Sequence, residues 1–153
     1  MANPFPFVAG QVLTAAELNG IGEAGTAFTP TYTGYTRGNG TVFAKFMRVN
    51  QFVFVYVQEI LGSTSSMTAS PVMDLPVASN GAASQLKSGV EFYDDSANII
   101  YFGQTRSSGG TTVEINAQLA SGTYVSRAQP SATVPFTWAT GDRFTFAICY
   151  EAA

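Results

Sequence analysis

The chain has 153 residues with a hydrophobic content of 46%, which is enough for the core of one domain and a short appendage. Only 11% of the residues are charged and the net charge is −3, so the clustered Lys and Arg that a nucleic-acid partner requires are missing. No run of about 18 apolar residues is present, and the sequence predicts no membrane insertion.

Residues 1–25 differ in character from the rest of the chain. Two early prolines favour an extended run, and Thr14 with Glu17 has the spacing of a helix capping box. The predicted helix is too short to be stable alone in water, so it needs the β-domain, sister subunits or another protein to pack on. This segment also lacks the basic start and long apolar core of a secretory signal. The apolar residues of this arm are Phe5, Phe7, Val8, Val12, Leu13 and Leu18.

From residue 26 onward the pattern is that of β-strands. Residues 41–49 and 52–60 flank Asn50–Gln51 and predict a hairpin. The second strand is apolar on both faces for several residues, and we therefore expect both faces to be covered. Its two faces carry Phe52, Phe54, Tyr56 and Ile60 on one side and Val53, Val55 and Val57 on the other.

The middle of the chain alternates predicted loops and strands. We expect a polar loop over Gly62–Ser70, a hairpin that turns at Asp95–Ser96 and a strand over 111–119. Residues 121–134 are rich in Ser, Thr, Gly and Pro and predict mostly loop.

The last residues predict a second strong hairpin. Val134–Ala139 leads through a Gly-Asp turn into Arg143–Tyr150, where Phe, Phe, Ile and Tyr alternate with shorter or polar residues. Cys149 is the single cysteine of the chain, so an intrachain disulfide is excluded, and we expect a packed thiol. The run around Trp138 is apolar and places this side chain in the predicted core.

The total is about eight to ten short strands with a turn signal every 8–12 residues or so. No helical period appears after residue 25. We therefore predict an all-β fold, an antiparallel β-sandwich (jelly-roll-like) head domain over residues 26–153. A short N-terminal extended and helical arm over residues 1–25 precedes it.

Residue types that carry common enzyme chemistry are sparse. The chain contains no histidine, which removes Ser–His–Asp and Cys–His catalysis and the commonest metal ligand. Asp94–Asp95 is the one acidic cluster, and two local carboxylates fall short of the roughly six to eight oxygens that Ca²⁺ takes. We therefore expect no enzyme, no catalytic residues, no cofactor and no metal.

The two termini resemble a known group of proteins. Pro135–Trp138, Gly141–Asp142 and Tyr150–Glu151 resemble the terminal hairpin of small β-rich minor tail, tail-fibre or capsid decoration proteins of tailed bacteriophages. Asn50 stands where that family usually has Gly, a small departure because Asn tolerates positive φ. The start of the chain resembles the short leader of many phage tail and fibre proteins, with matches at Gly10, Leu13, Thr14, Ala15, Leu18 and Asn19.

This resemblance implies a structural virion protein on the particle surface, assembled in the host cytoplasm. The implied assembly is a homotrimer mounted on a larger phage structural protein through residues 1–25. The main hypothesis is a minor tail or fibre adsorption component that presents loops to the host. The alternative is a capsid decoration (head-fibre) protein held to the shell by the same arm, and a fibre-borne glycan hydrolase is a third.

The main hypothesis requires a recognition surface, and loops carry recognition more often than strands. Sugar-binding sites combine an aromatic face with carboxylate or amide acceptors, and a bacterial surface glycan is the partner that such a mix favours. For the turn over residues 93–98, an ordinary solvated turn is the alternative interpretation. The other polar loops are Gly62–Ser70, Arg106–Thr111 and Ala120–Ser131. The candidate receptor-binding residues are Tyr93, Asp94, Asp95 and Asn98.

Overall fold

The computed structural model describes residues 10, 12, 14, 15, 25–81 and 88–153. In this part of the chain the regular elements are ten β-strands, which confirms the predicted all-β class. The strands are β1 (Thr26–Ala27), β2 (Tyr32–Thr36), β3 (Thr41–Val49), β4 (Phe52–Ile60), β5 (Ser66–Asp74), β6 (Gly89–Asp94), β7 (Ile99–Ser107), β8 (Thr112–Ser121), β9 (Tyr124–Ala128) and β10 (Arg143–Glu151).

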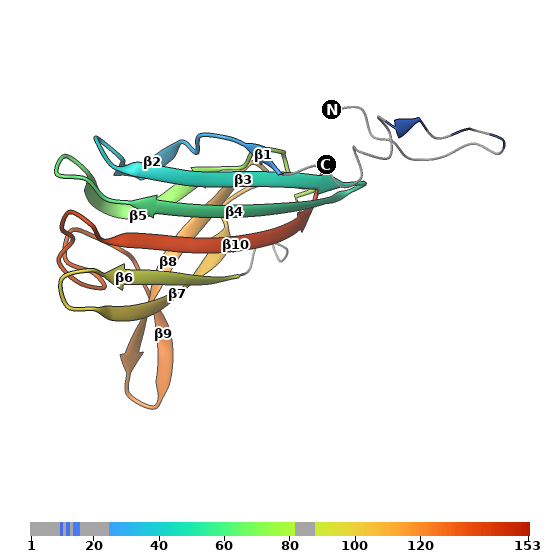
Figure 1. Ribbon diagram of the computed structural model, residues 1–153. Coiled ribbons are helices and arrows are strands. Elements are labelled where there is room, and N and C mark those ends of the chain that lie inside the picture. Colours follow the sequence, from blue (N-terminus) through green and yellow to red (C-terminus); the bar gives the residue numbers. More distant parts are fainter. Residues whose placement is uncertain (1–9, 11, 13, 16–24, 82–87) are drawn as a thin grey trace.

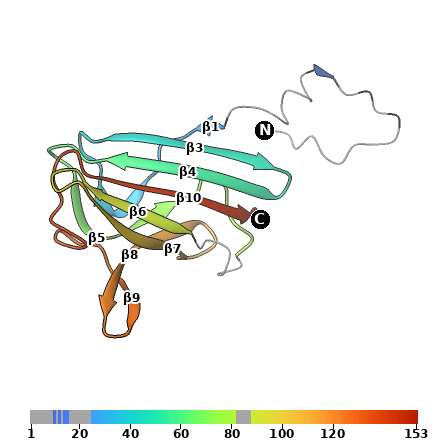
Figure 2. The same cartoon turned by 60° about the horizontal axis from the view of Figure 1, so that its bottom comes forward.

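All ten strands belong to one antiparallel sheet, which curls into a half-barrel (Figures 1 and 2). The strand order is β1-β3-β4-β10-β6-β7-β8-β5-β2, and β9 pairs with β8 beside this path. The predicted antiparallel arrangement is therefore confirmed. The predicted two-sheet sandwich and jelly roll are not confirmed, because hydrogen bonds connect every strand into a single continuous sheet.

The curl of the sheet encloses the core on its concave side. Tyr35 of β2 lies edge-on to Phe144 of β10 with ring centroids 5.2 Å apart, although these strands are far apart in the sheet order. Phe92 of β6 contacts Phe144 and Trp138 on the same side. Side chains from the β2 edge and from the middle of the sheet thus meet on the concave side.

Two of the predicted hairpin features are confirmed. β3 and β4 pair from Thr41↔Ile60 to Val49↔Phe52, and Asn50 takes the positive φ of 55° that its turn requires. β10 pairs with β4 on one side and β6 on the other, so the C-terminal strand lies inside the sheet. Its predicted apolar face is buried as Phe144, Phe146, Ile148 and Tyr150.

Two predicted loops are wrong because they contain strands. Ser66–Asp74 forms β5, and its buried Met67 and Met73 outweigh the polar composition of the segment. Tyr124–Ala128 forms β9, which pairs with β8. β-propensity depends on what the partner strand offers, so polar segments become strands when a partner edge is available.

The first half of the predicted C-terminal hairpin is also wrong. Residues 129–142 connect β9 to β10 as a loop, within which Ser131 and Val134 make an isolated bridge. Pro135 has no N–H to donate to a sheet. Phe136 and Trp138 instead stack with centroids 4.5 Å apart, and the predicted place of Trp138 against the core is confirmed.

The prediction that β4 is covered on both faces is wrong. Val53, Val55 and Val57 are buried, whereas Phe52, Phe54 and Tyr56 on the opposite face are 56%, 46% and 39% exposed. Cys149 of β10 lies on this same convex side and is exposed, contrary to the packed thiol that we expected. The curled sheet covers only its concave side with its own side chains.

Of the arm residues named above, Val12 is described, and it is 85% exposed. Phe5, Phe7, Val8, Leu13 and Leu18, together with the predicted helix after Thr14, lie outside the described residues. No helix in the described part of the chain is long and apolar enough to span a membrane.

Candidate functional site

The two ends of the sheet differ in what they carry. At one end, called here the loop end, lie the connections 37–40, 61–65, 95–98 and 139–142, at the left of Figure 1. At the opposite end lie the Asn50–Gln51 turn and the C-terminal residue, whose neighbour Ala152 donates its N–H to the Gln51 carbonyl. The register of β10 confirms this polarity, because Arg143 lies opposite Tyr93 at the loop end while Glu151 lies opposite Phe52.

The structure brings the predicted receptor-binding residues together at the tip of the β6–β7 hairpin. The Tyr93 hydroxyl donates a hydrogen bond of 2.7 Å to Asn98 Oδ1, and Asn98 has a positive φ of 56°. The Arg143 guanidinium lies 4.1 Å from the centroid of the Tyr93 ring, a cation–π geometry. One face of this ring is therefore occupied, and a ligand would meet the ring edge and the hydroxyl.

Asp94 shapes the backbone of the same tip. Its Oδ1 accepts hydrogen bonds from the Ala97 N–H at 2.9 Å and the Ser96 hydroxyl at 2.8 Å. The first of these bonds, with a smaller effect from the second, lowers the pKa of Asp94. Asp94 therefore holds the turn, while the exposed Asp95 carboxylate is the group available to an outside partner.

A buried carboxylate that sequence reasoning treated only as a turn residue joins three loops. Asp142 is 1% exposed, and its Oδ1 accepts the Asp95 N–H at 2.9 Å while Oδ2 accepts the Ala139 N–H at 2.5 Å. Its backbone carbonyl accepts the Leu61 N–H at 2.8 Å. Because hydrogen bonds to ionised groups are stronger than neutral ones, Asp142 fixes the position of the tip relative to its neighbours.

A second polar link holds the remaining loops of the loop end. The Asn39 side-chain carbonyl accepts the Thr64 N–H at 2.9 Å, and the Thr64 hydroxyl accepts the Asn39 N–H at 2.9 Å. Arg37 makes two hydrogen bonds to the Glu59 carboxylate, at 2.8 Å and 2.6 Å. The loop end is therefore a pre-ordered surface rather than a set of independent loops.

Glu59 is the deepest charge of the molecule among the described residues with 0% exposure. Glu59 follows the valines on the inward-facing side of β4. The alternation of the strand alone therefore did not identify it as a candidate functional residue. Burial, and secondarily the negative Glu59 carboxylate, raises the pKa values of Tyr32 and Tyr35. Hydrogen bonds to Glu59 raise the pKa of Arg37.

Of the other predicted recognition loops, Gly62–Ser70 contributes Thr64 to this surface, whereas Arg106–Thr111 and Ala120–Ser131 do not join it. The 108–111 turn between β7 and β8 lies at the opposite end, where the Ser79 N–H donates to the Gly110 carbonyl. Residues 120–131 contain the β8–β9 hairpin, which projects from the sheet in Figures 1 and 2. Its exposed apolar residues are Leu119, Tyr124 and Val125.

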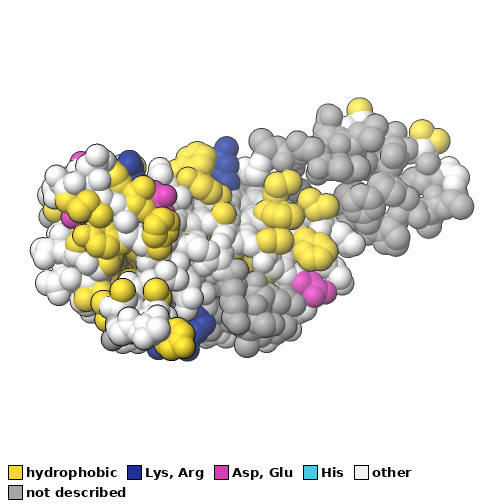
Figure 3. Space-filling model, turned by 90° about the horizontal axis from the view of Figure 1, so that it is seen from below, with side chains coloured by type: hydrophobic (Ala, Val, Ile, Leu, Met, Phe, Trp, Pro, Cys, Tyr) yellow, Lys and Arg dark blue, Asp and Glu magenta, His cyan; other side chains and the backbone are white. Residues whose placement is uncertain are grey.

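A second surface feature is the convex side of β3, β4 and β10, called here the outer face. Its register row Met47–Phe54–Cys149 is apolar, and the row beyond it pairs Val49 with Phe52. Toward the loop end, Gln58 and Thr145 form a more polar row. Figure 3 shows hydrophobic side chains gathered in separate areas of the surface, with polar and backbone atoms between them.

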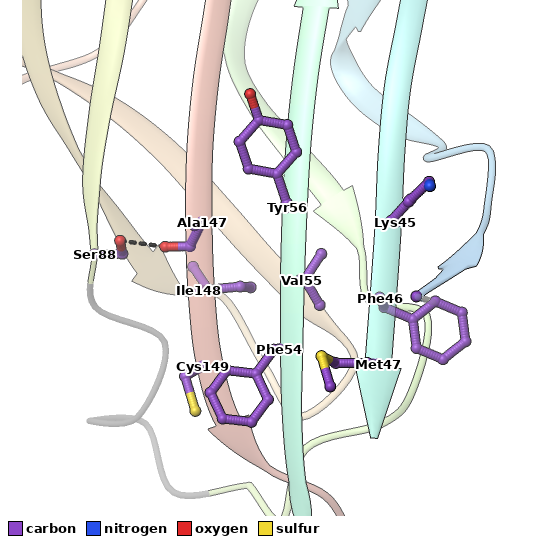
Figure 4. A pocket seen from close by; sticks show the side chains of 11 residues that line it. Lys45, Phe46, Met47, Phe54, Val55, Tyr56, Ser88, Ala147, Ile148 and Cys149 are labelled. Atoms are coloured by element: carbon purple, nitrogen blue, oxygen red, sulfur yellow. Dashed lines mark hydrogen bonds between the residues drawn. The ribbon is translucent and has the colours of Figure 1, made fainter. Parts of the chain in front are cut away.

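The outer face is hollowed by a groove of about 590 Å³. Cys149, Phe54 and Met47 lie in a row across it, and Tyr56 extends it toward the loop end (Figure 4). Lys45 is the one charged side chain in its lining, and the Ser88 hydroxyl donates to the Ala147 carbonyl at its far wall. Gly25 also belongs to this lining.

Comparison of the chain with protein families, with curated proteins and with solved structures found no match. Among the described residues, no group of three or more His, Cys, Asp or Glu side chains could hold a metal ion. The geometry therefore offers two features that could bind a partner: a hydrogen-bonding polar tip at the loop end and an apolar groove on the outer face.

Proposed function

We propose that this chain is a structural virion protein of a tailed phage, a trimeric β-domain mounted through residues 1–25 and displaying its loop end to the host surface. In this proposal the curled sheet is the jelly-roll-like head domain. Neighbouring subunits cover the convex side that the half-barrel leaves exposed. The bacterial partner is a surface glycan.

The observation that carries the proposal is the polarity of the sheet. β1 pairs Thr26 with Phe46 and Ala27 with Lys45, so the first residue of β1 lies on the side of the Asn50–Gln51 end of β3. The Tyr93–Asn98 tip lies at the other end. A protein that is held at one end and recognises a surface with the other requires this separation.

The chemistry of each region supports the same division. The loop end presents Asp95 and the Tyr93–Asn98 pair on a backbone already fixed by Asp142, which reduces the ordering cost of binding. The outer face exposes large apolar side chains on three adjacent strands. Contiguous apolar surface of this kind marks protein interfaces, and a homotrimer would cover it.

The test uses particles that carry tip variants. Tyr93→Phe with Asp95→Ala removes the hydroxyl and the free carboxylate but keeps the ring under Arg143. We expect adsorption to host cells to weaken by about fivefold or more, the loss of one significant interface contact. Gln51→Ala at the opposite end is the matched control, and unchanged adsorption is expected there. Equal adsorption by both variants would remove the tip from the proposal.

Copy number separates the tail position from the capsid alternative. Densitometry of purified particles should give a few copies for a fibre or tail component and tens to hundreds for a decoration protein. Deleting residues 1–24 leaves β1 intact and is expected to give a folded domain that no longer joins particles. A truncated chain that still assembles into virions would contradict attachment through the arm.

A further inference from the structure

We propose that the groove on the outer face is the seat of residues 12–24 from a second copy of this chain, so that each subunit of the assembly holds its neighbour by its N-terminal segment. This inference rests on the homotrimer of the proposed function and names the contact that builds it. The distal part of the arm, with Phe5, Phe7 and Val8, remains for attachment to the particle.

The lining of the groove is apolar and suits the binding of aliphatic side chains. Met47, Phe54 and Cys149 form a continuous apolar row across three strands, and Tyr56 flanks it (Figure 4). Phe54 and Tyr56 remain 46% and 39% exposed in the single chain. A volume of about 590 Å³ lies within the roughly 300–1,000 Å³ range of cavities that bury a whole ligand.

The position of Gly25 identifies residues 12–24 as the segment that binds the groove. Gly25 lines the groove, so the point at which residues 12–24 join the domain lies beside it. Residues 12–24 contain three Gly or Asn residues and four large aliphatic side chains. A segment this short offers these aliphatic side chains no partner of its own. These are Val12, Leu13, Leu18 and Ile21.

The segment is long enough to reach another subunit. Thirteen residues span about 40 Å when extended, whereas neighbouring strands lie only about 5 Å apart, so a groove three strands wide is crossed with residues to spare. The positions of this segment that the structure describes, Val12, Thr14 and Ala15, are all exposed in the isolated chain. Val12 of this segment and the apolar side chains of the groove are therefore both exposed in one copy, and they are complementary between two.

An arm-to-groove contact also has the right symmetry. It joins two different surfaces, and such heterologous contacts close into rings when the rotation between subunits permits. A contact of a face with its own copy would instead give a two-fold dimer. The groove and the segment thus account for a trimer without requiring a third surface.

The single cysteine makes the inference directly testable, because Cys149 lies in the groove wall. Two full-length chains are co-expressed: the unchanged chain, whose only thiol is Cys149, and an Ala15→Cys chain with Cys149→Ser, whose only thiol is in the arm. A short bismaleimide should join one of each. Thr123→Cys with Cys149→Ser places the thiol on the projecting β8–β9 hairpin and is the matched control, expected to give no product.

A second readout follows the groove in the unmodified assembly. Leu13→Asp with Leu18→Asp should raise the rate at which Cys149 reacts with a thiol reagent by about tenfold or more, because the aliphatic contacts that cover it are lost. Leu119→Asp on the projecting hairpin is the control and should leave the rate unchanged.

Each outcome decides between specific alternatives. An additional Ala15→Cys chain that keeps Cys149 tests the alternative: a cross-link within this chain, with no product between the two single-thiol chains, would show that the segment binds its own groove and would overturn the inference. No cross-link in a protein that sediments as a trimer would overturn the inference while leaving the proposed function intact. A chain that sediments as a monomer would contradict both.

Discussion

The two faces of β4 are equally apolar in sequence, but one is buried and the other is exposed in the structure. Val53, Val55 and Val57 are at most 2% exposed on the concave side, while Phe52, Phe54 and Tyr56 are 39–56% exposed on the convex side. The concave side is covered by Phe144, Tyr35 and other residues of its own chain. On the convex side Tyr56 contacts Phe43, and the side chains remain exposed. Hydrophobic alternation therefore shows which residues need covering, whereas the partner that covers them is a property of the assembly.

The largest contrast is expected from the same substitution on the two faces. Phe144→Ala empties the centre of an aromatic cluster and should lower the free energy of unfolding by about 3–5 kcal/mol. Phe54→Ala on the outer face should change it by about 0.5 kcal/mol or less when urea unfolding is measured on dilute, dissociated subunits. Similar losses for both variants would show that the faces do not differ.

A second contrast concerns charge. Arg37→Ala leaves Glu59 buried without its ion-pair partner, and we expect a loss of about 3–5 kcal/mol in the free energy of unfolding. Arg106→Ala is the matched control, because its side chain is 53% exposed and Glu114 keeps Arg127 at 3.5 Å. Its expected effect is about 0–1 kcal/mol. A small effect at Arg37 would contradict the view that the buried ion pair stabilises the fold.

Tyr150 gives the concave face a defined pH dependence. Burial raises its pKa to about 12, although its hydroxyl also donates to the Val77 carbonyl at 2.7 Å. The folded protein keeps this proton where the unfolded chain has lost it. Stability is therefore constant below about pH 10 and falls as the pH rises toward about 12, and Tyr32 and Tyr35 act in the same direction.

Urea unfolding between about pH 9 and 12 measures this dependence. Tyr150→Phe should lower the free energy of unfolding by about 1 kcal/mol at neutral pH, because its hydrogen bond is lost. At alkaline pH it should reduce the number of protons released on unfolding by about one, which flattens the dependence of the free energy of unfolding on pH. A slope that the substitution leaves unchanged would show that Tyr150 does not resist ionisation in the folded state.

The last contrast lies within the tip. Asn98→Gly keeps the positive φ, whereas Asn98→Ala places a side chain in a left-handed conformation that costs about 1–2 kcal/mol. Asp95→Ala should alter the free energy of unfolding by less than about 0.5 kcal/mol, since its carboxylate is exposed. Thermal unfolding of the three variants distinguishes a residue that shapes the tip from one that is free to bind.

Sequence reasoning found what is local and missed what depends on distant partners. The β3–β4 hairpin and β10 were predictable because alternation and an Asn-containing turn are properties of adjacent residues. β5 and β9 were missed because their polar residues become strands only when another edge pairs with them. Likewise, the Tyr93–Asn98 tip is visible in six consecutive residues, whereas the Asp142 link and the Arg37–Glu59 pair join residues far apart in the chain.

The groove on the outer face shows the same division. The apolar alternation of β4 predicts that Phe54 needs covering, but it does not say what covers it, and Phe54 is 46% exposed in the single chain. The register that aligns Met47, Phe54 and Cys149 comes from the pairing of three strands, one of which is about 90 residues further along the chain. No short motif carries that information.

Sedimentation equilibrium of the full-length protein at micromolar concentration tests the central claim most directly, because the proposed mounting, the covered outer face and the exchanged segment all require subunits to associate. The account predicts a species of three times the 16.2-kDa chain mass, which Phe54→Asp shifts toward the monomer. A single species at the mass of one chain, unaffected by that substitution, would contradict it.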